Sequence, residues 1–163
     1  MKRKKVDNFK KIFSLLFLLF WCLLIFYFSN QKGDISKNSS NSIIELLNQF
    51  LRIFSDSVDL NNIEGISFLI RKSAHMFLYF VLYIAIFSVF KSFNFLKNIK
   101  SYFLILGLCF LYAISDEVHQ LFISERSFGI IDILIDTFGS SLGFFFLSFG
   151  NKKIKSQDKR MKS

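Results

Sequence analysis

The chain has 163 residues, 52% of them hydrophobic and 24 of them Phe, and it contains no Pro. This length fits one domain, which we predict to be a single membrane domain over residues 1–163, because the apolar residues gather in long runs. The formal net charge of +9 comes largely from Lys and Arg outside these runs. That placement argues against nucleic acid as a partner and for the lipid bilayer.

Four runs are long enough to cross a bilayer, which takes about 17–25 apolar residues per helix. In chain order they are residues 12–28, 73–90, 102–123 and 128–149. We therefore predict an all-α membrane protein built as a four-helix transmembrane bundle. The basic segment before the first run resembles a signal peptide. The run is longer than a signal peptide needs and no small-residue cleavage site follows it, so we expect a retained helix.

Lys and Arg are distributed unequally between the two sides of these spans. Fifteen of the 21 precede the first run, separate the second from the third, or follow the fourth, and six lie in the other two connections. Basic loops tend to stay on the cytoplasmic side. We therefore predict a multi-pass protein of the cell membrane with both termini cytoplasmic and with residues 30–72 and 124–127 outside.

Between the first two runs, residues 42–54 (SIIELLNQFLRIF) place apolar and polar side chains on opposite faces of a helix. Ser42 and Glu45 have the spacing of a capping box, which predicts that the helix begins at Ser42. Thirteen residues are too few to cross a bilayer. We predict an extracytoplasmic amphipathic helix that lies at the interface or packs across the outer ends of the spans. A lid over a substrate site is the alternative.

Polar residues gather at the predicted outer end of every span. They are Ser29, Asn30 and Gln31 after the first run, Arg71, Lys72 and His75 at the start of the second, Asp116, Glu117, His119 and Gln120 at the end of the third, Arg126 in the turn, and Asp132 and Asp136 in the fourth. An ionised group near hydrocarbon costs roughly a few kcal/mol unless it is paired or hydrated. We therefore expect one polar pocket open to the outside.

The helical phase of the fourth span adds detail to this expectation. Asp132, Asp136, Gly139 and Gly143 share a narrow stripe. Glycines four residues apart let another backbone approach closely, so the two aspartates should face helices rather than lipid. The same glycine pair is a reason to expect a homo-oligomer.

At these positions the chain resembles the VanZ-like family of small bacterial membrane proteins, one member of which is associated with low-level teicoplanin resistance. The matching segments are FSNQ (28–31), RKSAHMFLY (71–79), SDEVHQLF (115–122), Arg126, Asp132 and GSSLG (139–143). The chain departs from the family pattern at Ser124-Glu125, usually Pro-Gly, and at Asp136, often Asn. The resemblance implies a cell-envelope membrane protein linked in some members to glycopeptide response, and it implies no reaction.

The residues predicted to bind a ligand are Arg71, Lys72, His75, Asp116, Glu117, Gln120, Arg126, Asp132 and Asp136. In the first hypothesis the cations hold an anionic lipid or an envelope partner, and the protein affects glycopeptide susceptibility without catalysis. In the alternative, an intramembrane enzyme modifies an outer-leaflet lipid or a lipid-linked cell-wall precursor. The candidate catalytic residues are then Asp116, Glu117, His119 and Asp132.

Two other interpretations concern the same charges. The cations can simply neutralise the carboxylates and hold the geometry of the bundle. A set of His75, His119, Asp116 and Asp132 could ligate a metal, since imidazole and carboxylate suit zinc or manganese. Proton transfer through the group of Asp, Glu and His residues is a further interpretation. No His-x-x-x-His pattern is present, and we predict no metal and no cofactor.

Overall fold

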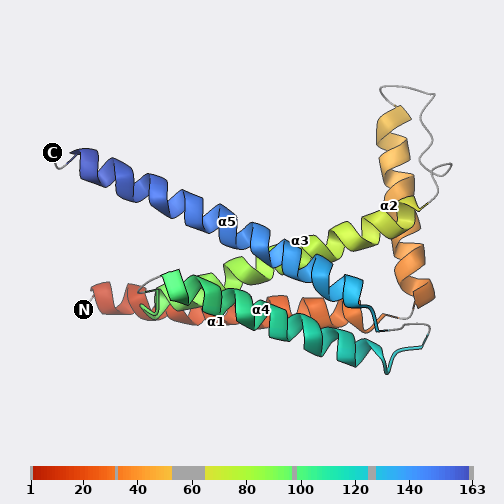
Figure 1. The fold of residues 1–163 in the computed structure, drawn as a ribbon, viewed down its shortest axis with the longest axis horizontal. Coiled ribbons are helices and arrows are strands. Elements are labelled where there is room, and N and C mark those ends of the chain that lie inside the picture. The colour runs from red at the N-terminus through yellow and green to blue at the C-terminus, as the bar shows by residue number, and fades with distance from the viewer. Residues whose placement is uncertain (1, 32, 53–64, 97–98, 125–127, 162–163) are drawn as a thin grey trace.

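The computed structural model describes residues 2–31, 33–52, 65–96, 99–124 and 128–161 (Figure 1). These residues form five helices, namely α1 (Lys2–Ser29), α2 (Gly33–Arg52), α3 (Ile66–Ser92), α4 (Ile99–Gln120) and α5 (Ile130–Met161). The described ranges contain no strand. The prediction of an all-α protein is confirmed.

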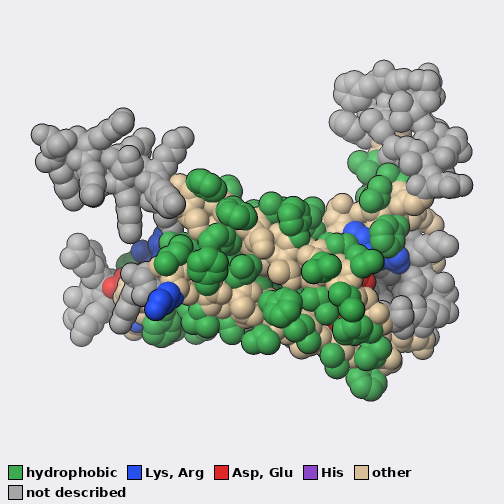
Figure 2. Space-filling view, viewed as in Figure 1, with side chains coloured by type: hydrophobic (Ala, Val, Ile, Leu, Met, Phe, Trp, Pro, Cys, Tyr) green, Lys and Arg blue, Asp and Glu red, His purple; other side chains and the backbone are tan. Residues whose placement is uncertain are grey.

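Four of these helices contain segments long and apolar enough to cross a membrane. The segments are Val6–Ser29, Ile66–Ser92, Ile99–Gln120 and Ile130–Phe149. Their outward faces are apolar, with Leu19 and Phe146 each more than half exposed. Figure 2 shows hydrophobic side chains over the middle of the bundle and charged side chains near its two ends. This distribution fits a lipid environment and confirms the transmembrane four-helix bundle.

The connectivity brings the polar ends of the spans together. Helices α1 and α4 run in one direction through the bundle and α3 and α5 run in the other (Figure 1). The beginning of α1 and the last turns of α5 therefore lie at one end, and the last turns of α1 and α4 and the first turns of α3 and α5 lie at the other (Figure 1). That the former end is cytoplasmic stays a prediction.

Helix α3 is central and contacts the other four helices. Its Tyr79, Leu82 and Tyr83 are fully or almost fully buried in the core. Two hydrogen bonds tie α1 to its neighbours. Trp21 Nε1 donates to the Leu78 carbonyl of α3 (2.8 Å), and the Tyr112 hydroxyl of α4 donates to the Cys22 carbonyl (2.9 Å). Such bonds and close packing hold helices together in lipid, where apolar burial alone does not.

The glycine stripe of α5 packs against α3. A Cβ added at Gly139 would lie 2.1 Å from the Met76 carbonyl oxygen, and one added at Gly143 would lie 2.9 Å from Tyr83 Cβ. The inward phase predicted for this stripe is therefore correct. Both glycines are buried within the chain, so they do not offer the surface for a homo-oligomer that their spacing suggested.

Helix α2 lies across the end of the bundle (Figure 1). It begins at Gly33, so the prediction that Ser42 starts the helix was wrong, and the Ser42 hydroxyl donates to the Asn38 carbonyl within it (3.2 Å). Among the α2 side chains whose burial the structure describes, the buried ones are Ser40, Ile44 and Asn48, spaced four apart. Leu46, on the predicted apolar face, is 65% exposed. Ile43 and Leu47 of the same face are 43% and 41% exposed, so a large part of this face is available to a membrane interface.

Candidate functional site

A group of eight residues, which we term the polar cluster, forms at the end of the bundle where α1 and α4 finish and α3 and α5 start. Its members are Ser29, Lys72, His75, Asp116, Glu117, Gln120, Asp132 and Asp136. Asp116, Glu117, Gln120 and Asp136 are each at most 4% exposed. Buried carboxylates need partners, so the contacts of each one indicate whether it holds the fold or is left for a ligand.

Lys72 of α3 forms an ion pair with Asp132 of α5. The Lys72 ammonium also lies 5.0 Å from the centre of the Phe68 ring, within the range of a cation–π contact. The two charged side chains are 18% and 24% exposed. Both groups therefore have partners in the fold, as the interpretation of mutual neutralisation expects.

Gln120 connects α4 to α1. Its Nε2 donates to the Ser29 hydroxyl at 3.0 Å and to Asp116 Oδ2 at 3.3 Å. The amide thereby joins the last turns of two helices and orients one oxygen of Asp116.

Glu117 of α4 binds the backbone just before α5. Its Oε2 accepts a hydrogen bond from the Gly129 N–H (2.8 Å), just before the first turn of α5. A carboxylate near a helix N-terminus also interacts favourably with the helix dipole. This contact gives Glu117 a structural role.

His75, Asp116 and Asp136 come from three helices and have ligand atoms within 4.8 Å of one another. His75 Nδ1 lies 3.7 Å from Asp136 Oδ1, an ion-pair distance that is too long for a hydrogen bond. Neither oxygen of Asp136 has a hydrogen-bond partner among the described residues. In the described part of the chain, these three residues form the group that could hold a metal.

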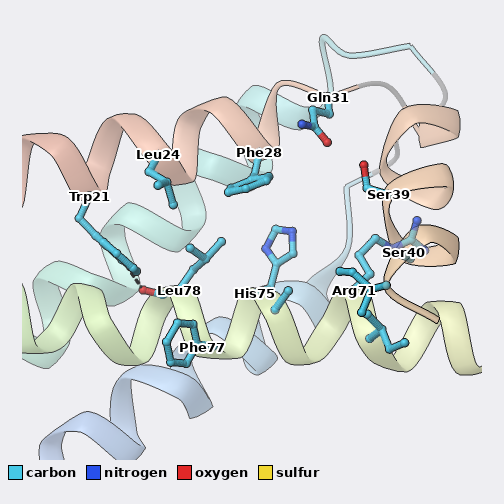
Figure 3. A pocket seen from close by; sticks show the side chains of 13 residues that line it. Trp21, Leu24, Phe28, Gln31, Ser39, Ser40, Arg71, His75, Phe77 and Leu78 are labelled. Atoms are coloured by element: carbon cyan, nitrogen blue, oxygen red, sulfur yellow. Dashed lines mark hydrogen bonds between the residues drawn. The ribbon is translucent and has the colours of Figure 1, made fainter. Parts of the chain in front are cut away.

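A groove of about 350 Å³, termed the α1–α3 groove, lies between these two helices and is bordered by α2 (Figure 3). Its apolar wall includes Trp21, Leu24, Phe28, Phe77 and Leu78, and three further apolar residues line the groove, namely Ile43, Ile70 and Ala74. Its polar end consists of Gln31, Ser39, Ser40, Arg71 and His75. His75 thus belongs to both the polar cluster and the groove.

The predicted catalytic candidates have separate surroundings. The His119 ring stacks on Phe26, with ring centres 4.7 Å apart, and does not belong to the group around Asp136. Asp132 is paired with Lys72, and Glu117 binds Gly129. Arg126, predicted to bind the ligand, lies outside the described residues.

The apolar wall of the groove and its two serines from α2 were absent from the sequence prediction. A Trp or Phe within an apolar span gives no signal that separates a groove wall from a lipid-facing side chain. The serines had a usable signal, because residues 34–52 contain no Gly or Pro and Ser40, Ile44 and Asn48 repeat at helical spacing. Recognising an earlier helix start would have placed Ser40 near the span ends.

Comparison with models of protein families gives a match to VanZ/LLP1 over residues 13–151. Comparisons with curated proteins and with solved structures give no match. The family match includes every residue of the polar cluster and of the α1–α3 groove. Since it covers most of the chain and agrees with the predicted resemblance, the chain belongs to the VanZ/LLP1 family.

Proposed function

We propose that this VanZ/LLP1 protein binds an anionic membrane lipid in the α1–α3 groove as a non-catalytic component of the cell envelope, and that this binding lowers glycopeptide susceptibility. The observation that carries the proposal is a cationic residue, Arg71, that lines the polar end of a groove whose lining is otherwise largely apolar. An anionic phospholipid combines a charged headgroup with apolar chains, so it matches both ends of this groove.

Arg71 differs from Lys72 in its contacts. Among the described residues Lys72 is paired with Asp132, whereas Arg71 has no carboxylate partner and lies 6.0 Å from the centre of the Phe68 ring. A guanidinium presents a planar fork of donors that fits two oxygens of a phosphate. Arg71 is therefore suited to a headgroup phosphate.

The rest of the groove supports the same ligand class. Its described lining contains no carboxylate, which favours an anion over a cation. Phe28 and Phe77 of the apolar wall are 42% and 58% exposed, so the groove is accessible from the bilayer. A volume of about 350 Å³ falls within the range of ligand pockets, roughly 300–1,000 Å³, and suits a headgroup with the first part of its chains.

Binding has more support than catalysis. None of the candidate catalytic residues lines the groove, and three of the four have separate contacts. A general acid or base must lie within hydrogen-bond reach of the reacting group, directly or through one water. We therefore put forward no second function.

Trp21 is the chain's single tryptophan and lines the groove, so its fluorescence can report lipid binding. With the full chain in detergent, brominated phosphatidylglycerol should quench Trp21 at lower concentration than brominated phosphatidylcholine. Arg71→Gln should weaken the apparent affinity for phosphatidylglycerol about tenfold, because about 1.4 kcal/mol of charge-assisted hydrogen bonding is lost.

Lys91→Gln is the matched control, since it removes one positive charge from the opposite end of α3. It should leave the preference for phosphatidylglycerol unchanged. Equal quenching by the two lipids in the wild type, or unchanged binding in Arg71→Gln, would contradict the proposal.

The proposed link to antibiotic response has its own test. In a strain whose teicoplanin susceptibility depends on this chain, Arg71→Gln should be as susceptible as the deletion. Mass spectrometry should find the same envelope lipids and wall precursors in the wild type, the variant and the deletion. A lipid or precursor that changes in the deletion would favour the enzyme hypothesis.

A further inference from the structure

We infer that His75, Asp116 and Asp136 form a binding site for one divalent transition-metal ion, of the class that includes Zn²⁺ and Mn²⁺. The inference goes beyond the lipid proposal and stands on a different set of contacts. It replaces the prediction of no metal, and its ligand set differs from the set of His75, His119, Asp116 and Asp132 considered from the sequence.

The geometry of the three ligands supports the site. One nitrogen and two carboxylate oxygens, from α3, α4 and α5, lie within 4.8 Å of one another. Bonds to Zn²⁺ measure about 2.0–2.2 Å, so two ligand atoms on one ion are separated by at most about 4.4 Å. Small side-chain rotations suffice to close the set. One imidazole with two carboxylates suits Zn²⁺ and Mn²⁺.

The second observation is the isolation of Asp136. Its side chain is 1% exposed, and neither oxygen has a hydrogen-bond partner among the described residues. The neighbouring Ser140 hydroxyl donates to the backbone carbonyl of Asp136 instead of its carboxylate. The nearest group of opposite character is the His75 imidazole, 3.7 Å away. A buried carboxylate without hydrogen bonds is destabilising, and a cation bound between it and His75 would remove that cost.

No lysine or arginine among the described residues pairs with Asp136. Lys72 is paired with Asp132 one turn away on α5. Asp116 is held through one oxygen by Gln120, which also binds Ser29. Hydrogen bonds of this kind orient ligating carboxylates in metal sites. The Tyr79 hydroxyl, one turn after His75 on α3, is buried and has no hydrogen-bond partner among the described residues either.

His119 and Asp132 do not belong to the inferred ligand set. The His119 ring stacks on Phe26, and Asp132 is the ion-pair partner of Lys72. His75, in contrast, also lines the α1–α3 groove. A metal on His75 would add positive charge beside the groove.

The test uses the full chain, purified in detergent without a histidine tag, stripped with a chelator and titrated separately with ZnCl₂ and MnCl₂ by calorimetry. We expect about one ion of at least one metal per chain. Asp136→Asn should weaken that binding about 100-fold or more, beyond the 10–100-fold typical of losing a mere supporting group. His119→Gln, a matched loss of the other histidine, should bind as the wild type does.

Folding is checked by the thermal unfolding of each variant with and without metal. The metal should raise the melting temperature of the wild type and of His119→Gln but not that of Asp136→Asn, whose metal-free stability should equal or exceed that of the wild type. Absence of stoichiometric binding to the folded wild type, or equal binding in Asp136→Asn, would overturn the inference. Arg71→Gln should retain metal binding, which separates a failure of this site from a failure of the lipid proposal.

Discussion

Gly139→Ala should destabilise the bundle by about 1–3 kcal/mol, the usual cost of overpacking a tight contact. The added Cβ would lie 2.1 Å from the Met76 carbonyl oxygen and about 3 Å from two further backbone atoms of Met76. Backbone atoms cannot rotate away as a side chain can, so α3 and α5 must separate. Because α3 contacts all the other helices, this shift should disturb the polar cluster as well.

Gly107→Ala is the matched control. Gly107 lies within α4, and a Cβ added there would meet nothing within 4 Å. Ala is favoured over Gly in a helix interior by about 1 kcal/mol, so this variant should be neutral or slightly stabilised. Unfolding in detergent, by heat or by increasing dodecyl sulfate, compares the two. Equal stability of the two variants would show that the α3–α5 contact is looser than the structure has it.

The orientation of α5 was predictable from the sequence because it depends only on helical geometry. Asp132, Asp136, Gly139 and Gly143 share one face of any α-helix. Glycines and aspartates in an apolar span are also poorly suited to face lipid, so that face had to meet protein. The four spans were predictable for a similar reason, since the thickness of the bilayer sets their minimum length.

The partners of the charged residues were not predictable in the same way. Helical phase says which side chains share a face, whereas the helix opposite and its register depend on crossing angles and on close contacts such as Gly139 with Met76. Asp132 and Asp136 are therefore equivalent in the sequence pattern. In the structure Asp132 pairs with Lys72, whereas the one basic side chain within ion-pair distance of Asp136 among the described residues is His75, at 3.7 Å.

The α1–α3 groove was missed because it depends on α2. A helix beginning at Ser42, as predicted, would not have included Ser39 and Ser40, which border the polar end of the groove. The capping-box pattern at Ser42 and Glu45 is a short local signal, and the residues before it (GDISKNSSN, 33–41) are mostly weak helix formers, so helical propensity does not predict the earlier start that α2 has in the structure.

The second large effect is expected at the Lys72–Asp132 pair, where the two single substitutions should differ. Four carboxylates lie in the polar cluster, and Lys72 is the lysine or arginine paired with one of them among the described residues. Lys72→Met leaves Asp132 unpaired beside three other carboxylates, which should cost about 2–4 kcal/mol in this partly buried setting. Asp132→Asn removes a negative charge from the same cluster and leaves a lysine that can extend toward water, so its cost should be smaller.

The double variant Lys72→Met, Asp132→Asn tests this reasoning. Replacing both members of a buried pair is often nearly neutral, so the double variant should be more stable than Lys72→Met alone. Unfolding of the four proteins in one detergent gives the coupling energy, and Lys91→Met reports the effect of losing a lysine from the other end of α3. If the cost of the double variant equals the sum of the two single costs, the interaction between Lys72 and Asp132 does not stabilise the protein. The repulsion among the carboxylates would then have to be relieved elsewhere, and the inferred cation between Asp116 and Asp136 is the group placed to do so.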